Sequence, residues 1–195
     1  MVGMKMNRWS RMAVKSLTAS IGLLFLIFLY LSQTRESGRY RAASIMLGTA
    51  FYLFIIRHLS GDLVRQLRRT PWNYENAWFR EKDWEQPLYR QLRVRRWKDY
   101  LPTNRPEDFD LEQHSIDYII NTSCRSEVVH EIIIVASFGI LLIPLNMLDD
   151  RQYFGLFLLT ALVSALTDTI FTIVQRFNRP RLISLKERLD RAEVA

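Results

Sequence analysis

The heptapeptide C-R-S-E-V-V-H, residues 124–130, joins a polar segment to the apolar run 128–148. Glu127 and His130 are three residues apart, and on a helix this spacing puts both side chains on one face, about one turn from each other. A carboxylate beside an imidazole can orient a neutral base or stabilise its charged form. The pair is therefore a candidate catalytic site at the edge of a membrane. The alternative is an interfacial pair that only caps a helix and extends its polar groups into the water.

Composition and charge favour a membrane protein. The chain has 195 residues, a net charge of +7 and 49% hydrophobic residues, about one domain's worth of protein. Its mean hydropathy is near zero because long apolar runs alternate with strongly charged segments. Basic clusters flank the apolar runs, which favours anionic lipid over nucleic acid as their partner. The single cysteine, Cys124, excludes an internal disulfide and a multi-thiolate metal site. No metal is expected at Glu127 and His130 either, because such a site needs several further ligands and the remaining histidines are distant in sequence.

Four apolar segments predict an all-α membrane protein with about four transmembrane helices, at residues 13–32, 42–60, 128–148 and 154–174. The first can also be read as a signal peptide, but no small-x-small cleavage site follows it. The second is short enough to be re-entrant or interfacial. Pro144 is expected to kink the third. Asp168 lies inside the fourth, where a carboxylate should face a partner or a wet cavity.

Residues 61–127 predict an amphipathic, aromatic-rich region of short helices at the membrane interface, since Trp and Tyr beside Arg and Lys suit the headgroup layer. The expected short helices are residues 62–69, 75–84, 88–100 and 111–120. The expected organisation is an N-terminal transmembrane hairpin (1–60), this interfacial region (61–127), a second transmembrane hairpin (128–175) and a basic cytoplasmic tail (176–195).

Loop charges predict the orientation in the cell membrane. The N-terminus, the middle region and the tail are rich in Lys and Arg, whereas the connector 149–151 is net acidic. The positive-inside rule then places both termini and the middle region of this multi-pass protein in the cytoplasm. The basic residues of the connector after the first apolar segment argue weakly against this orientation.

Three blocks of sequence resemble a known family. They are V-R-R-W-K-D-Y-L-P at residues 94–102, R-S-E-V-V-H at 125–130 and V-Q-R-F-N-R-P-R-L at 174–182. Together they are similar to the glycosyl-4,4'-diaponeurosporenoate acyltransferase family, small membrane proteins that act last in staphyloxanthin-type carotenoid synthesis. The resemblance covers about residues 78–183. The chain departs from the family at T-S-C (122–124), where Glu-Thr-Lys is frequent, at Glu131 in place of Trp, and at Asp168 in place of Asn. These departures leave the acceptor open.

The resemblance implies transfer of a fatty acyl group to a sugar hydroxyl of a glycosylated carotenoid or related glycolipid. The donor would be an acyl thioester, acyl-CoA or an acyl carrier, used as a co-substrate without a further cofactor. His130 is the candidate base, and Glu127 would orient it, with Glu131 as a substitute. Asn178 would donate to the oxyanion. The remaining candidates for donor and substrate binding are Trp97, Lys98, Asp99, Arg125, Arg176, Arg179 and Arg181.

Several alternatives remain open. The arginines can instead anchor lipid headgroups, although Asn-Arg-Pro-Arg at residues 178–181 is expected to form a turn that anchoring does not need. Cys124 can be considered as an acyl-carrying nucleophile. The protein can also be a non-enzymatic adaptor that anchors a biosynthetic enzyme, or a lipid-binding protein without turnover. An adaptor should tolerate His130→Gln, and an enzyme should not. A phosphate-binding Arg179 should lose donor affinity more than fold when replaced by alanine.

Overall fold

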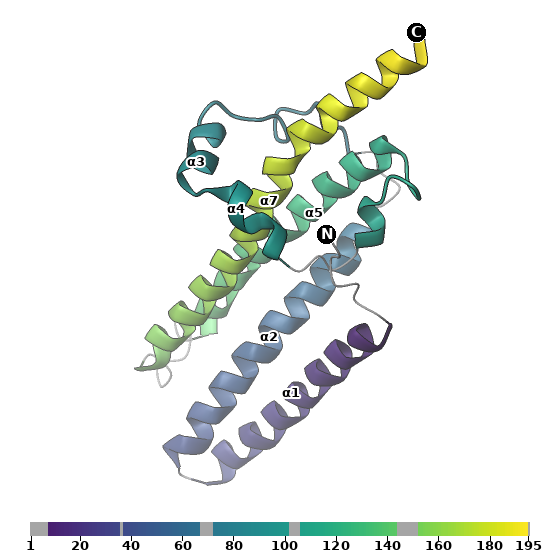
Figure 1. Cartoon of the computed structure of the whole chain (residues 1–195). Helices are drawn as coiled ribbons and strands as arrows, with labels where there is room; N and C mark the ends of the chain where they lie inside the picture. The colour runs from purple at the N-terminus through teal and green to yellow at the C-terminus, as the bar shows by residue number, and fades with distance from the viewer. Residues whose placement is uncertain (1–7, 36, 67–71, 102–105, 144–151, 195) are drawn as a thin grey trace. The chain divides into compact units, whose positions relative to one another are not determined.

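A computed structural model describes residues 8–35, 37–66, 72–101, 106–143 and 152–194 of the chain. The described residues form helices and connecting turns and contain no strand, which confirms the expected all-α class (Figure 1). The long helices are α1 (Arg8–Thr34), α2 (Gly38–Gln66), α5 (Ile116–Ser137) and α7 (Phe154–Val194). The short ones are α3 (Glu85–Gln91), α4 (Val94–Trp97), η2 (Lys98–Tyr100), η3 (Pro106–Phe109) and η4 (Phe138–Leu141).

Three of the described helices are long and apolar enough to cross a membrane, over Met12–Thr34, Gly38–Leu63 and Phe154–Ala192. Since α2 is continuous over 29 residues, the second apolar segment is long enough for a full crossing. Large apolar side chains on these helices are exposed, as helices surrounded by lipid require, among them Leu23, Leu26, Met46, Leu159 and Leu166. These are the features of a membrane protein.

The third expected span is described only in part. Its first residues belong to the C-terminal half of α5, and η4 continues them. Residues 144–148, with Pro144, and the acidic connector 149–151 lie outside the described residues. The count of four spans therefore stays a prediction.

Two of the short helices expected in the middle region need correction. Residues 62–66 are helical, but they are the end of α2, and residues 67–69 of the expected helix 62–69 lie outside the described residues. Residues 75–84 form turns instead of a helix. The Asn73 side chain accepts a hydrogen bond from the main-chain N–H of Glu75 at 2.9 Å, which favours a turn over a helix.

The other two expected helices have different bounds. The segment 88–100 is broken into α3, α4 and η2, because Arg93 adopts the left-handed conformation with φ of 52°. The helix expected at 111–120 begins only at Ile116 and then continues as α5 through the start of the expected third span.

The turn expected at Asn-Arg-Pro-Arg is also wrong, since α7 runs from Phe154 to Val194 with Pro180 inside it. Proline removes one helical hydrogen bond and disfavours a helix interior. Here its neighbours Phe177 and Arg179 are both buried, so tertiary packing holds this part of the helix.

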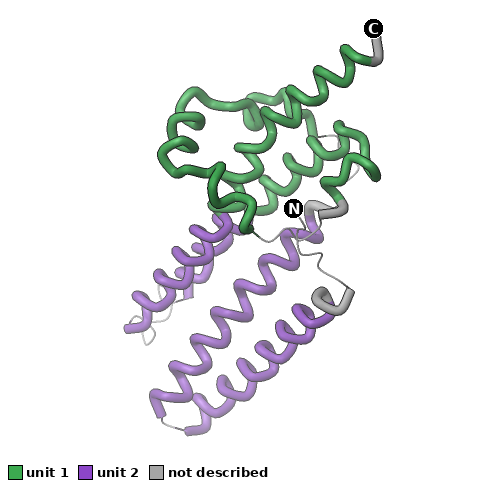
Figure 2. Tube along the Cα trace, viewed as in Figure 1, with its two compact units in different colours: residues 1–6, 64–131, 169–195 green, residues 7–63, 132–168 purple. Residues whose placement is uncertain are grey.

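Contacts divide the chain into two compact units (Figure 2). Among the described residues, unit 1 comprises the segments within Val64–Glu131 and Thr169–Ala195, and unit 2 those within Asn7–Leu63 and Ile132–Asp168. The helices α5 and α7 each contribute one part to each unit. The division thus combines segments that are distant along the chain.

Unit 2 contains an antiparallel hairpin of α1 and α2 (Figure 1). The Phe25 and Phe51 rings stack with centroids 6.4 Å apart. A Cβ added to Gly22 would meet the ring of Phe51 at 2.7 Å, and one added to Gly48 would meet the ring of Phe25 at 2.7 Å. The two glycines therefore allow each ring to approach the backbone of the opposite helix, as in other tightly packed membrane helices. Elsewhere in unit 2, the Tyr52 hydroxyl donates to the carbonyl of Ala136 at 2.7 Å.

In unit 1, a small apolar cluster places α3 and α4 against α7. Its buried members are Tyr89, Val94 and Phe177, and Trp97 and Ile173 pack against it. The rings of Tyr89 and Phe177 meet edge to face with centroids 5.5 Å apart. This packing positions α3 beside the part of α7 that carries the third block of family resemblance, residues 174–182.

Candidate active site

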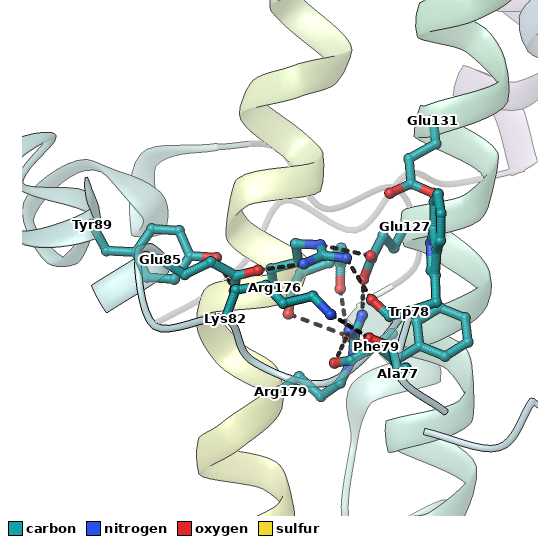
Figure 3. A network of polar contacts seen from close by, with 12 residues as sticks. Ala77, Trp78, Phe79, Lys82, Glu85, Tyr89, Glu127, Glu131, Arg176 and Arg179 are labelled. Carbon is teal, nitrogen blue, oxygen red and sulfur yellow. Dashed lines mark hydrogen bonds and ion pairs between the residues drawn. The ribbon is translucent and has the colours of Figure 1, made fainter. Parts of the chain in front are cut away.

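Glu127 is at the centre of a buried ionic network in unit 1 (Figure 3). The side chain of this α5 residue is fully buried. Arg176 of α7 donates from Nε to Oε1 at 2.8 Å, and Arg179, one turn further on, donates from Nη2 to Oε2. Both carboxylate oxygens are thus bonded to guanidinium groups. Such a pair is stable in a buried environment only because the charges compensate each other.

Glu85, at the start of α3, is a second buried carboxylate of the network. Arg176 donates to its Oε1 from Nη1, and the Tyr89 hydroxyl donates to its Oε2 at 2.8 Å (Figure 3). Burial and the neighbouring Glu85 carboxylate raise the pKa of Tyr89 above its ordinary value, so this phenol stays a donor. Two carboxylates and two guanidinium groups leave the network with no net charge.

The same arginines also hold the turns that precede α3. Arg176 donates from Nη2 to the carbonyl of Trp78 at 2.7 Å, and Arg179 donates from Nη1 to that of Phe79 at 3.0 Å. The Arg179 guanidinium also lies over the Phe79 ring, 5.0 Å from its centroid. The carbonyl groups of a segment without helical bonds thereby find donors. The network joins segments that are 49 to 100 residues apart in sequence.

His130 lies one turn beyond Glu127 on α5 and is half-buried. Its ring stacks on that of Phe171 with centroids 5.0 Å apart and an interplanar angle of 12°. The next residue, Glu131, accepts a hydrogen bond from Nε1 of Trp78 at 3.1 Å (Figure 3). The imidazole is therefore held by an aromatic face, with one carboxylate following it in sequence and another one turn before it.

Residues from the first resembling block contribute to packing and to the surface. The indole N–H of Trp97 donates to the carbonyl of Leu92 at 2.9 Å, and its ring packs on the apolar cluster of unit 1. Lys98 and Asp99 pair with each other at 3.0 Å.

The remaining sequence candidates lie outside the buried network. Arg125 donates to Oγ1 of Thr122 at 2.7 Å, Asn178 is half-buried, and Arg181 is exposed. Of the residues predicted from the sequence, the buried network contains Glu127, Arg176 and Arg179, which are bonded to one another.

Sequence reasoning missed Glu85, Tyr89 and the two carbonyl groups of the turn. The only local signal for the first two was a Glu–Tyr pair four residues apart on a short helix. Partners on α5 and α7 could not be read from that spacing. Among the described residues, no group of three His, Cys, Asp or Glu side chains is placed to hold a metal ion.

A family model described as glycosyl-4,4'-diaponeurosporenoate acyltransferase matches residues 75–188, more than half of the chain. The chain belongs to this family. The matched range contains every residue of the ionic network and His130. No curated protein and no solved structure matches the chain. The resemblance read from the three sequence blocks is thereby confirmed, and so is the prediction of an enzyme, an acyltransferase of carotenoid biosynthesis.

Membership in this acyltransferase family bears on Cys124, the only thiol. The side chain is fully buried in α5, and burial raises the pKa of the thiol from 9.0 to about 11. A thiol that is protonated at neutral pH and shielded from solvent is a poor nucleophile. The geometry thus gives no support to an acyl-cysteine intermediate in this family member.

A cavity of about 590 Å³ lies against the network in unit 1 of this acyltransferase. Glu85, Arg176 and Arg179 contribute to its wall, together with turn residues that precede α3 and side chains from the C-terminal part of α7. A volume in the range of about 300–1,000 Å³ is typical of small-molecule sites. The network therefore forms one wall of a space that is large enough for a ligand.

Proposed function

We propose that the protein transfers a fatty acyl group from an acyl thioester to a sugar hydroxyl of a glycosylated carotenoid or a related glycolipid. The observation that carries the proposal is the family match over residues 75–188, because this range holds His130 and the buried network around Glu127. A lipid-soluble glycosylated acceptor follows from the family. Acyl-CoA or an acyl carrier thioester is the proposed donor, and no further cofactor is proposed.

In the proposed reaction His130 accepts the proton of the sugar hydroxyl as its oxygen attacks the thioester carbonyl. The carbon–oxygen bond forms, and Asn178 donates to the developing oxyanion. When the carbon–sulfur bond breaks, the imidazolium returns the proton to the departing thiolate. The products are a sugar ester and a free thiol, so atoms and charge balance.

Glu127 supports this chemistry as a positioning residue. Its carboxylate is neutralised by Arg176 and Arg179, so it holds α5 in place rather than serving alone as the counter-charge of His130. Glu131 is then the nearer carboxylate in sequence to balance an imidazolium, and Trp78 fixes its side chain. This division of roles extends the earlier hypothesis, in which Glu127 orients the base.

The phosphates of the donor are proposed to bind Arg181. Arg176 donates from Nε, Nη1 and Nη2 to protein acceptors, and Arg179 donates from Nη1 and Nη2. Nε of Arg179 is buried without a hydrogen-bond partner among the described residues. Arg181, in contrast, is exposed, and its guanidinium lies over the Phe177 ring at 4.3 Å. Arg181 also lines a shallow groove of about 360 Å³ on α7, together with Ser184 and Arg188. Two guanidinium groups and a hydroxyl on one helix face suit a phosphate. Lys98, Asp99, Arg125 and Trp97 remain proposed contacts of the substrates.

The proposed setting is the cell membrane, crossed four times, with both termini and the middle region in the cytoplasm. The three apolar helices support the membrane location, and the basic flanks of the apolar segments support the orientation. A cytoplasmic site suits a soluble thioester donor, and the spans suit a lipid acceptor. Reporter fusions at each terminus, active only in the cytoplasm or only outside it, test the orientation.

Mass spectrometry of lipid extracts tests the reaction. Cells that supply a glycosylated carotenoid or a glycolipid express the wild type, His130→Gln or an empty vector at matched protein levels. We expect a species heavier by one fatty acyl group in the wild type alone. If His130→Gln also makes this species, the catalytic assignment is wrong, although acyl transfer stands. If no sample contains it despite good expression, the proposed reaction is wrong for these acceptors.

A further inference from the structure

Each cation on the wall of the 590 Å³ cavity already donates to a protein acceptor. The wall carries four of them, Arg80, Arg176, Arg179 and Lys186. Two of these cations, Arg176 and Arg179, belong to the buried network. Lys186 Nζ lies 3.2 Å from a carboxylate oxygen of each of Asp117 and Asp190, and Nε of Arg80 donates to the carbonyl of Glu75 at 2.6 Å. A phosphate entering here would compete with acceptors that are already bonded.

The cavity wall also carries carboxylates that can accept further hydrogen bonds. There are five, Glu75, Glu81, Glu85, Glu187 and Asp190, so with four cations the wall carries a net charge of −1. The side chains of Glu75 and Glu187 are exposed and receive no hydrogen bond or ion pair from another described residue. Each carboxylate can accept several hydrogen bonds. The cavity therefore offers carboxylate oxygens that can accept further hydrogen bonds, which suits a ligand that has hydrogen-bond donors.

An apolar surface lies beside these acceptors. Phe79, Pro180 and Ile183 line the cavity, and Tyr74 adds a half-buried aromatic ring. A sugar ring has the matching pattern, because its C–H groups form an apolar face and its hydroxyls project from the rim. Aromatic side chains pack against such a face while polar groups satisfy the hydroxyls.

We infer that this cavity binds the sugar of the acceptor as an uncharged, hydroxyl-rich group. Glu75 and Glu187 accept hydrogen bonds from its hydroxyls, and Tyr74 packs against its ring. The inference rests on the proposed function and names the site of the acceptor's polar end. It also separates the two substrates, because the donor phosphates are proposed to bind the groove that Arg181 lines.

Direct binding tests the inference without turnover. The purified full-length protein is held in a polyoxyethylene detergent, since a detergent with a sugar headgroup would occupy the site. Methyl glycosides of glucose, galactose and mannose are then titrated, with saturation-transfer NMR as the readout. We expect saturation transfer from the protein to at least one of these glycosides. The same experiment with glucosamine and glucose 6-phosphate probes charge, and neither should bind more tightly than glucose.

Two carboxylate replacements locate the binding. Glu75→Gln and Glu187→Gln keep shape and remove charge, and each should weaken sugar binding about tenfold. Glu112→Gln is the matched control, because Glu112 is an exposed carboxylate of unit 1 that does not line the cavity. Unchanged binding in the double variant Glu75→Gln/Glu187→Gln overturns the inference. So does the absence of binding by every neutral glycoside, or preferred binding of the amine or the phosphate.

Turnover assays separate this inference from the proposed function. If glycosides bind through Glu75 and Glu187 but no acylated product forms, the cavity assignment stands and the proposed reaction fails. If product forms and the double variant leaves the KM for the acceptor unchanged, the reaction stands and the cavity assignment fails.

Discussion

Arg57 of α2 donates a hydrogen bond to the carboxylate of Asp168 of α7, 111 positions further along the chain. Both residues belong to unit 2, and Asp168 is almost fully buried. The same guanidinium reaches Oγ of Ser164 at 3.3 Å, and Ser164 lies 2.8 Å from Oγ of Ser137 on α5. A carboxylate inside an apolar helix thus has a cationic partner, and the polar contacts connect three helices.

Removing this carboxylate should destabilise unit 2. Asp168→Leu leaves Arg57 without its counter-charge beside apolar helices, and we expect a loss on the order of 3 kcal/mol in the free energy of unfolding. Unfolding of the purified protein in mixed micelles with rising SDS measures it. Leu166→Ala, at an exposed position of the same helix, should change stability by less than about 0.5 kcal/mol. Adding Arg57→Met to Asp168→Leu should recover part of the loss, and no recovery would contradict the pairing.

Replacing Arg179 should affect the fold more than donor binding. Arg179→Met leaves the buried carboxylate of Glu127 with one guanidinium fewer and the Phe79 carbonyl without its donor. We expect a loss of about 3–5 kcal/mol, measured as the unfolding free energy of the purified protein. Arg181→Met is the matched control, because Arg181 is exposed, and its stability should stay within about 0.5 kcal/mol. A stable Arg179→Met protein that has lost only donor affinity would restore the phosphate-binding hypothesis.

Replacing Arg181 should instead act on the donor. Arg181→Gln removes one cation from the groove shared with Arg188, so the KM for acyl-CoA should rise about tenfold with little change in kcat. Steady-state kinetics with acyl-CoA and with an acyl-pantetheine that lacks the nucleotide phosphates provide the measurement. The KM for the acyl-pantetheine should be the same in wild type and variant. A rise for both donors would mean that Arg181 does not bind these phosphates.

Cys124 should behave as a shielded thiol. Because burial raises its pKa to about 11, a maleimide at pH 8 should label the folded protein slowly and the denatured protein fast, as read by intact mass. The unfolded chain releases this proton near pH 9.0 and the folded chain near pH 11. Its contribution to stability is therefore complete below about pH 9 and declines as pH rises from 9 to 11.

A cysteine-free variant isolates this effect. The difference in unfolding free energy between the wild type and Cys124→Ala should be constant below about pH 9 and shrink above it, since the other titrating groups are common to both proteins. Cys124→Ala should also retain acyl transfer. Loss of transfer in a folded Cys124→Ala protein would support the acyl-cysteine alternative.

Much of the helical architecture was predictable because its signals are local. The long apolar runs determine α1, α2 and the first part of α7, since about 20 apolar residues are long enough to span a bilayer. Asn73 shows how local prediction failed: residues 75–84 have helical spacing of apolar side chains, but a turn bond from the Asn73 side chain competes. Pro180 predicted a turn because proline disfavours a helix interior. The segment is nevertheless helical, because its neighbours Phe177 and Arg179 are packed in the core.

The family, the apolar helices and the spacing of Glu127 and His130 one turn apart on α5 could all be read from the sequence. The partners of the charged side chains became known from the folded chain. Arg176 and Arg179 bond to Glu127 across 49 and 52 residues of sequence, so both guanidinium groups are paired inside the protein. The physical reason is that helical spacing determines which side chains share a face, whereas a buried charge must find its counter-charge on whichever segment packs against it.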